Sequence, residues 1–302
     1  IDLCQRQSLS VESVHKGYTI LIWKVLWHLL TNGILMHIQK KERFTRILML
    51  RILRRLMKRT TTMSKRHWRM GSMLSVRSLA LKKEQAEELY ADAQSRELVL
   101  FEAIKTAYCP GFQKLLEIAC SGTVGSIRNV EACFTKLEDP KKRELTDTAY
   151  GGSFLELGSY VMLPILKLFG AAYEKLEFDT IKGKNGLDLF TRAILRYPTG
   201  IATATCGLGV KSEGRLLVSG TKGYIIVDAP WWKTTYFEVH YEDASKVDRY
   251  SETFLGDGLR YELSDFLAMI NHNEKARFKL TGKESIALAG MMEKFLEERQ
   301  KK

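Results

Sequence analysis

Apolar residues recur at helical spacing in three segments of the chain. Residues 82–97 place them three or four positions apart among charged residues, which predicts an amphipathic helix. A second helix is expected to begin at Pro110, because proline suits the first helical turn, and to end at Gly122, a common terminator. Residues 151–170 are longer and almost wholly apolar, which indicates a buried third helix with a glycine-rich entry.

Short apolar runs between turn signals predict strands. Residues 98–103 and 126–134 have the length of buried strands and lie between the predicted helices. After residue 170, strand-like segments follow one another across short turns, which favours antiparallel pairing. These segments are 176–181, 190–197, 200–206, 215–219, 224–227 and 235–241. Two closing helices are predicted at about 258–271 and 283–299. This order predicts an α+β arrangement on an open, mostly antiparallel sheet.

The charge of the chain changes near Ser78. Residues 1–77 hold 16 Lys and Arg against 3 acids, a net charge of +13, whereas residues 78–302 hold 31 bases and 32 acids, a net of −1. The whole chain of 302 residues is 45% hydrophobic and 27% charged, a globular composition that excludes wholesale disorder, collagen and a multi-span membrane protein. We therefore separate an aberrant basic segment, residues 1–78, from the remainder.

The cysteines follow no metal-binding spacing. Their odd number and irregular separation favour reduced thiols and a cytoplasmic location over a disulfide framework, and no metal site is expected. The five residues are Cys4, Cys109, Cys120, Cys133 and Cys206.

Five motifs in order resemble the Gfo/Idh/MocA family of nicotinamide-dependent oxidoreductases over about residues 79–300. The strongest is Y-G-G-S-F-L-E-L-G-S-Y at residues 150–160, which is similar to the family's G-G-G-x-L-x-D-x-G-x-H/Y helix start. The others are the acidic helix after L-A-L at 79–81, the strand end E-A at 102–103 with a helix opening at Pro110, S-G-T-K-G at 219–223 and G-D-G-L-R-Y-E at 256–262.

The resemblance implies a fold of the α/β and α+β classes. A degenerate or incomplete Rossmann region would precede an α/β domain with an open, mostly antiparallel sheet. Residues 79–108 would be the last βα piece of the Rossmann domain, and residues 109–302 the substrate and dimerisation domain. The implied cofactor is NAD or NADP, and the implied reaction moves a hydride between the nicotinamide and a sugar, polyol or related small-molecule carbinol. Copies of the chain would associate through the open sheet.

The resemblance also implies the catalytic residues. Lys105 and Tyr108 follow the strand that ends at Ala103, where the family's substrate and nicotinamide cleft lies. Lys105 would orient or protonate a hydroxyl, and Tyr108 would contact the substrate; a solvated surface lysine is the alternative. Glu156 and Tyr160 lie one helical turn apart and so share a face. Glu156 would bind hydroxyls, or else favour the helix dipole, and Tyr160 would relay the carbinol proton.

Three further residues complete the predicted site. Trp231, beside Trp232, would stack on a sugar or form a dimer surface, with core packing as the alternative. Glu102 is assigned to the cofactor. Arg77 occupies the position of the lysine in the family's E-K-P motif, where the chain reads Val76-Arg77-Ser78. A guanidinium does not release its proton at working pH, so Arg77 cannot replace that lysine as an acid.

The N-terminal segment lacks a dinucleotide-binding loop. Its only glycines, Gly17, Gly33 and Gly71, do not form G-x-G-x-x-G. Read one base earlier, the codons before Leu79 permit G-K-H-V-V-C-E-K-P, which is similar to the family's strand and E-K-P motif. We hypothesise that residues up to about 78 are an out-of-frame reading of a Rossmann domain, and that the chain is an N-terminal fragment of its gene product. A genuine basic N-terminus is the alternative.

Other functions remain open for this segment. Residues 19–38 are a nearly apolar 20-mer of membrane-spanning length, but Lys24 and His28 within it disfavour a span. The basic run from Arg43 to Arg77 has few aromatic residues, which disfavours nucleic-acid binding. The chain is thus either a dehydrogenase by descent, or a non-enzymatic remnant that binds partners, or a membrane-tethered version of either.

Overall fold

The computed structural model describes residues 74–76, 82–95, 99–270 and 279–301. The chain divides into two compact units, Ile1–Leu74 and Ser75–Lys302. The predictions made for residues 19–38, for the basic run and for Arg77 lie outside the described residues. Within the described part, no helix combines the length and apolarity that a membrane crossing needs.

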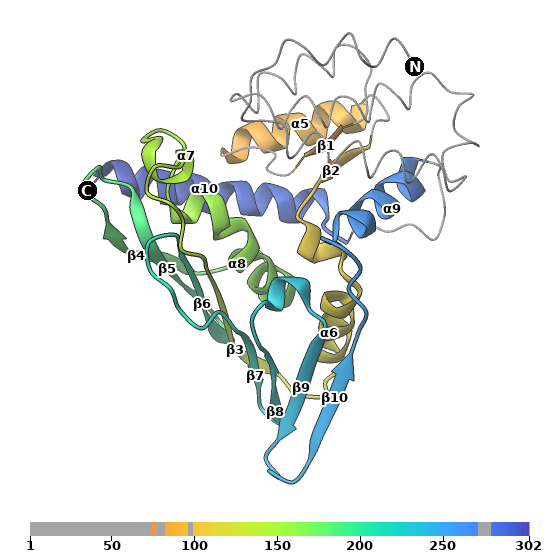
Figure 1. Ribbon diagram of the computed structural model, residues 1–302. Helices are drawn as coiled ribbons and strands as arrows, with labels where there is room; N and C mark the ends of the chain where they lie inside the picture. Colours follow the sequence, from red (N-terminus) through yellow and green to blue (C-terminus); the bar gives the residue numbers. More distant parts are fainter. Residues whose placement is uncertain (1–73, 77–81, 96–98, 271–278, 302) are drawn as a thin grey trace, which may run out of the picture. The chain divides into compact units, whose positions relative to one another are not determined.

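An open sheet of eight strands forms the centre of the second unit (Figure 1). Its strand order is β10-β9-β8-β7-β3-β6-β5-β4, and every neighbouring pair is antiparallel except β3 and β6. The strands are β3 Ile127–Thr135, β4 Lys175–Lys182, β5 Asp188–Tyr197, β6 Gly200–Gly207, β7 Leu216–Gly220, β8 Gly223–Val227, β9 Tyr236–Tyr241 and β10 Val247–Ser251. This confirms the open, mostly antiparallel sheet.

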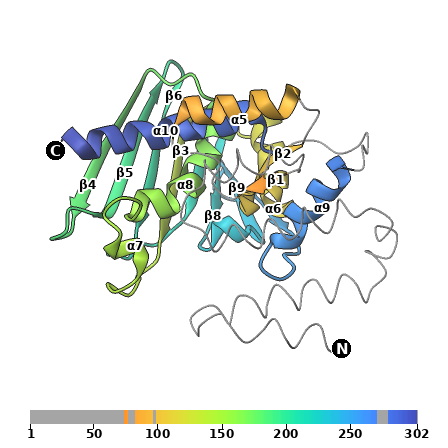
Figure 2. The ribbon, with the colours of Figure 1, turned by 90° about the horizontal axis from the view of Figure 1, so that it is seen from above.

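The long helix α8, Ser153–Phe169, packs on β3, β5 and β6, and α10, Gly282–Lys301, packs on α8 (Figures 1 and 2). Both lie on one face of the sheet. The remaining described elements are β1 Leu74–Val76, α5 Lys83–Ser95, β2 Leu100–Glu102, the 3-10 turn η1 Lys105–Tyr108, α6 Pro110–Cys120, α7 Arg143–Thr146, the 3-10 turn η2 Trp231–Lys233 and α9 Leu259–Ile270. The helices predicted from residues 82, 110, 151, 258 and 283 are all confirmed.

Phe154 joins α8 to the rest of the core. Its fully buried ring lies 5.1 Å from that of Phe178 on β4 and 4.5 Å from that of Phe295 on α10. The ring also lies over Gly158, one turn along the helix, where a Cβ would approach it to 3.1 Å. The sequence F-L-E-L-G therefore gives the helix a recess for its own aromatic side chain, and the N-terminal half of α8 is held against both sheet and helix.

Candidate functional site

The two glycines before α8 permit a close approach between the helix start and β5. Gly152 has φ +109°, a value that L side chains rarely adopt, and a Cβ there would lie 1.9 Å from Oδ1 of Asp188. A Cβ on Gly151 would lie 2.5 Å from the carbonyl oxygen of Asp147. The G-G pair of the sequence motif thus has a steric cause in this chain.

Asp188 and Ser153 fasten the first turn of α8 to the sheet. Oδ2 of Asp188 accepts hydrogen bonds from the Phe154 N–H at 2.7 Å and the Thr191 hydroxyl at 2.9 Å. The Ser153 hydroxyl donates to the Asp188 carbonyl and accepts from the Leu208 N–H, both at 2.9 Å. Burial raises the pKa of the Asp188 carboxyl, against the opposing effect of these hydrogen bonds.

Glu156 and Tyr160 project from the first half of α8. The Glu156 side chain is 30% exposed, and its Oε2 lies 3.7 Å from Nη2 of Arg143 on α7. This distance describes a weak ion pair between partly exposed groups. Tyr160 is 7% exposed, and its ring meets the ring of Phe134 edge-on, with centroids 5.6 Å apart. The helix thus places a carboxylate and a phenol one turn apart, as the sequence predicts.

An aromatic stack adjoins Tyr160. Phe134, near the end of β3, stacks on Trp232 with centroids 3.6 Å apart and planes within 9°. Both side chains are half-buried. Trp231 instead has no exposed surface, and its indole N–H donates to the Cys133 carbonyl at 2.7 Å. The alternative of core packing therefore describes Trp231, and Trp232 is the tryptophan of this pair that retains an exposed surface.

Lys105 and Tyr108 lie on the short turn η1. The Thr106 hydroxyl donates to the Trp232 carbonyl at 3.0 Å, so this turn is tied to the aromatic stack. Lys105 is partly exposed, which a role in proton transfer requires. Tyr108 is fully buried; its hydroxyl donates to the carbonyl of Glu102 at 2.9 Å, and burial raises its pKa. The substrate contact assigned to Tyr108 remains a prediction that needs this side chain to become accessible.

Glu102 is also buried, with 4% of its surface exposed. The structure therefore brings the predicted residues together in two groups. Glu102 lies with Tyr108, whose hydroxyl it binds through its carbonyl. Tyr160 lies against the Phe134–Trp232 stack, to which Thr106 of η1 is hydrogen-bonded. Sequence reasoning did not select Phe134 or Asp188. The signal for Asp188 is a single acid in the apolar run G-L-D-L-F at residues 186–190, a pattern that indicates a buried and hydrogen-bonded carboxylate.

The described residues contain neither a metal-binding cluster nor a pyrophosphate-binding loop. Among them, no three His, Cys, Asp or Glu side chains cluster so as to hold a metal ion. They likewise contain no glycine-rich loop at the start of a helix after a strand, which a pyrophosphate needs.

The cysteines of the described part differ in expected reactivity. Burial raises the pKa of Cys109 to about 12, and Cys206 is fully buried with its pKa raised well above the usual value. Cys120 is exposed. At pH 8 we expect an alkylating reagent to modify Cys120 first, and Cys109 and Cys206 only after unfolding, because the thiolate is the reactive form. Peptide mass spectrometry of native and denatured protein measures this order, and rapid native labelling of Cys109 would contradict the burial described.

Known proteins resemble this chain in sequence and in fold. Residues 112–226 match the family model of the GFO/IDH/MocA C-terminal domain. The trans-1,2-dihydrobenzene-1,2-diol dehydrogenase of Bos taurus is 31% identical over 166 residues, 54% of this chain and 50% of that protein. Its Sus scrofa counterpart is 28% identical over 230 residues, 74% of this chain and 68% of that protein. The chain thus spans about half to two thirds of these relatives.

A solved structure has the same fold. The 3-ketoreductase KijD10 of Actinomadura kijaniata, in complex with NADP and TDP-benzene, superposes with a TM-score of 0.64 at 19% identity, covering 77% of this chain and 73% of that one. Residues 112–226 are thus similar in sequence to the GFO/IDH/MocA C-terminal domain, and the described residues share the fold of this 3-ketoreductase.

Proposed function

We propose that the chain is an NAD(P)-dependent oxidoreductase that acts on the carbinol of a small cyclic substrate. The observation that carries this proposal is Tyr160, a phenol held at the edge of the Phe134–Trp232 stack on the helix whose entry resembles the family motif. The dehydrogenases of Bos taurus and Sus scrofa that resemble this chain are named for a cyclic diol, and the 3-ketoreductase of similar fold is complexed with NADP. These names support the same substrate class and cofactor for this chain.

The side chains of the domain suit the protein's share of this reaction. The Tyr160 hydroxyl would relay the carbinol proton, accepting it while releasing its own proton to water, as the substrate hydroxyl becomes a carbonyl. The partly exposed carboxylate of Glu156 would accept a hydrogen bond from a second hydroxyl, and Lys105 would donate to a substrate oxygen. The nicotinamide, when bound, supplies the hydride acceptor. The aromatic stack would hold the ring of the substrate through its flat faces.

The sequence also favours a second candidate. Because residues 1–78 contain no G-x-G-x-x-G, the chain can be a folded domain that binds partners but no dinucleotide. Fluorescence titration of the full chain with NADH and NADPH separates the two functions. Saturable binding at micromolar concentration supports the oxidoreductase. A folded protein without binding at millimolar cofactor supports the remnant and removes the proposed activity from this polypeptide.

The exposed face of the sheet supports self-association. A row of residues in register crosses its central strands, with Ile194, Thr203, Glu131, Leu217 and Ile226 side by side on β5, β6, β3, β7 and β8. All five are half-buried. They form a mixed apolar and polar strip in the middle of a face on which no described helix packs, a composition that suits a protein interface. We propose a homodimer through this face.

Adding a charge at the centre of the strip is expected to dissociate the dimer. In sedimentation velocity, Leu217→Lys should shift the chain from dimer to monomer at micromolar concentration, because a long ammonium side chain, even beside Glu131, would have to lose its water at the interface core. Gln94→Lys, which adds the same charge at an exposed position on α5, should leave the dimer intact. Equal sedimentation of wild type and Leu217→Lys would remove this face as the interface.

We propose a cytoplasmic location as well. The four cysteines of the described residues are free thiols, which a reducing compartment maintains. Cell fractionation followed by thiol quantification tests this: the chain should remain with the cytosol in reduced form, and recovery with membranes would contradict it.

A further inference from the structure

We infer that Asp188 is a positioning residue, which fixes the first turn of α8 and thereby sets the place of the Tyr160 phenol. This inference rests on the proposed function, because it assigns Asp188 a part in the same reaction. Asp188 itself is 1% exposed and does not reach the face on which the substrate would bind. Its effect must therefore pass through the helix.

The argument begins with the way α8 is capped. Its N-cap residue, Gly152, has no side chain, and no side-chain cap bond is made locally. The free N–H of Phe154 is instead taken by Asp188, 34 residues away on β5. A local cap would stabilise the helix wherever it lies, whereas a cap from another element also ties the helix to a place on the sheet.

The geometry of the helix carries this restraint to Tyr160. Phe154 and Tyr160 are six residues apart, about 9 Å along the helix axis. Helical side chains lean toward the N-terminus, so the Tyr160 side chain points back toward the first turns of the helix. Because α8 is a rigid element between these points, a shift or rotation of its first turn displaces the phenol by a similar amount. Displacements of about 1 Å are enough to impair catalysis substantially.

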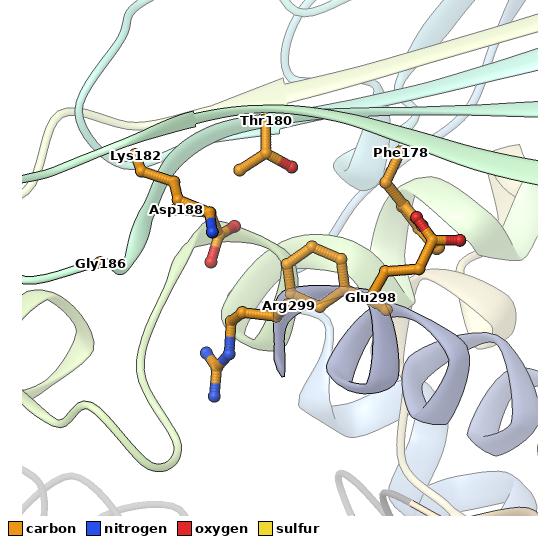
Figure 3. A pocket seen from close by; sticks show the side chains of 8 residues that line it. Phe178, Thr180, Lys182, Gly186, Asp188, Glu298 and Arg299 are labelled. Carbon is orange, nitrogen blue, oxygen red and sulfur yellow. The ribbon is translucent and has the colours of Figure 1, made fainter. Parts of the chain in front are cut away.

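A second charged group restrains the same segment. The guanidinium of Arg299, on α10, donates to the carbonyl oxygens of Gly151 and Ala149 at 3.0 Å each and of Thr148 at 3.4 Å. Asp188 and Arg299 line one small pocket between the β4–β5 hairpin and α10 (Figure 3). The helix entry thus lies between an acceptor on β5 and a donor on α10.

Asp188 is also placed at a cost. Its Oδ1 is buried and makes no hydrogen bond to the residues that the structure describes. A buried carboxylate oxygen without a partner is unfavourable. Stabilising the helix does not by itself require a buried aspartate from another strand. We therefore attribute to Asp188 the role of holding α8 in its place on the sheet.

A double-mutant cycle on turnover tests the inference. In the full chain, Asp188→Ala should lower kcat by about 10- to 100-fold, as a misplaced catalytic group does, with the KM for the dinucleotide unchanged. Asp188→Asn, which retains an acceptor, should recover most of kcat. In the Tyr160→Phe background, Asp188→Ala should cost less than about threefold more, because its effect passes through the lost hydroxyl. If Asp188→Ala still lowered kcat by about 10- to 100-fold in the Tyr160→Phe background, the inference would be overturned.

Hydrogen exchange provides a readout that needs no activity. Asp188→Ala, or Asp188→Val if the alanine variant does not fold, should speed amide exchange across residues 153–160 about fivefold or more while α10 and β7–β9 keep their protection, because neither variant offers an acceptor. Asp179→Asn, at an exposed position on β4, should change none of these segments. Unchanged exchange over 153–160 would overturn the inference. Absence of turnover in wild type would contradict the proposed function alone, since the exchange result still decides whether Asp188 fixes the helix.

Discussion

Replacing Tyr160 by Phe is expected to lower kcat by about 100- to 10,000-fold, the usual contribution of a positioned acid or base. The variant keeps the ring and its edge contact with Phe134, and it removes only the hydroxyl that would move the carbinol proton. The KM for the dinucleotide should stay the same. Steady-state kinetics at saturating substrate, followed by absorbance of the reduced nicotinamide, measures this effect.

Tyr173→Phe is the matched control for this variant. Tyr173 precedes β4, and its ring lies 5.8 Å from Nζ of Lys294 on α10, in no contact with the Phe134–Trp232 stack. Loss of its hydroxyl should leave kcat within about twofold, because the change lies outside the proposed site. If Tyr160→Phe also turned over at the wild-type rate, Tyr160 would have no part in proton transfer.

The largest effect on stability is expected from Gly152→Ala. The backbone at φ +109° disfavours any Cβ, and this one would lie 1.9 Å from Oδ1 of Asp188. Strain and overlap together should cost about 3 kcal/mol or more. For a domain of this size, that corresponds to a fall in Tm of roughly 6–12 °C in a thermal melt followed by circular dichroism.

Gly122→Ala separates the two causes. Gly122 has a similar backbone, φ +84°, but a Cβ there meets nothing within 4 Å. Gly122→Ala should therefore lower the free energy of unfolding by only about 1 kcal/mol, the cost of placing an L residue in this backbone conformation. Equal losses of Tm in the two variants would show that the contact with Asp188 adds nothing, and would contradict the packing described for the helix entry.

The local pattern of apolar and turn residues predicted most helices and strands of this fold, but it did not predict which strands pair with each other. Strand-like runs between turn signals located β4 to β9, because the turn residues mark where each strand ends. The strand β10, V-D-R-Y-S, was missed because an edge strand with charged residues lacks that pattern. The parallel pairing of β3 with β6 could not be read locally, because it depends on how α8 and the β4–β5 hairpin bring two distant strands together.

The site shows the same division. Glu156 and Tyr160 were selected through the resemblance of residues 150–160 to the family motif, and helical spacing puts them on one face. The choice between Trp231 and Trp232 was not predictable, because a single 3-10 turn decides which ring enters the core. Asp188 was missed because its partners, Phe154 and Gly152, are about 35 residues away and are met only in the folded chain.

Transfer of hydride from a carbinol can be followed directly with deuterium. The full chain would be incubated with a cyclic trans-diol deuterated at its carbinol carbons and with NADP or NAD, and the reduced cofactor analysed by mass spectrometry. We expect one deuterium in each reduced nicotinamide, formed at a rate that Tyr160→Phe strongly lowers. A folded chain that binds the dinucleotide yet transfers no deuterium from cyclic diols or sugars would contradict the proposed oxidoreductase.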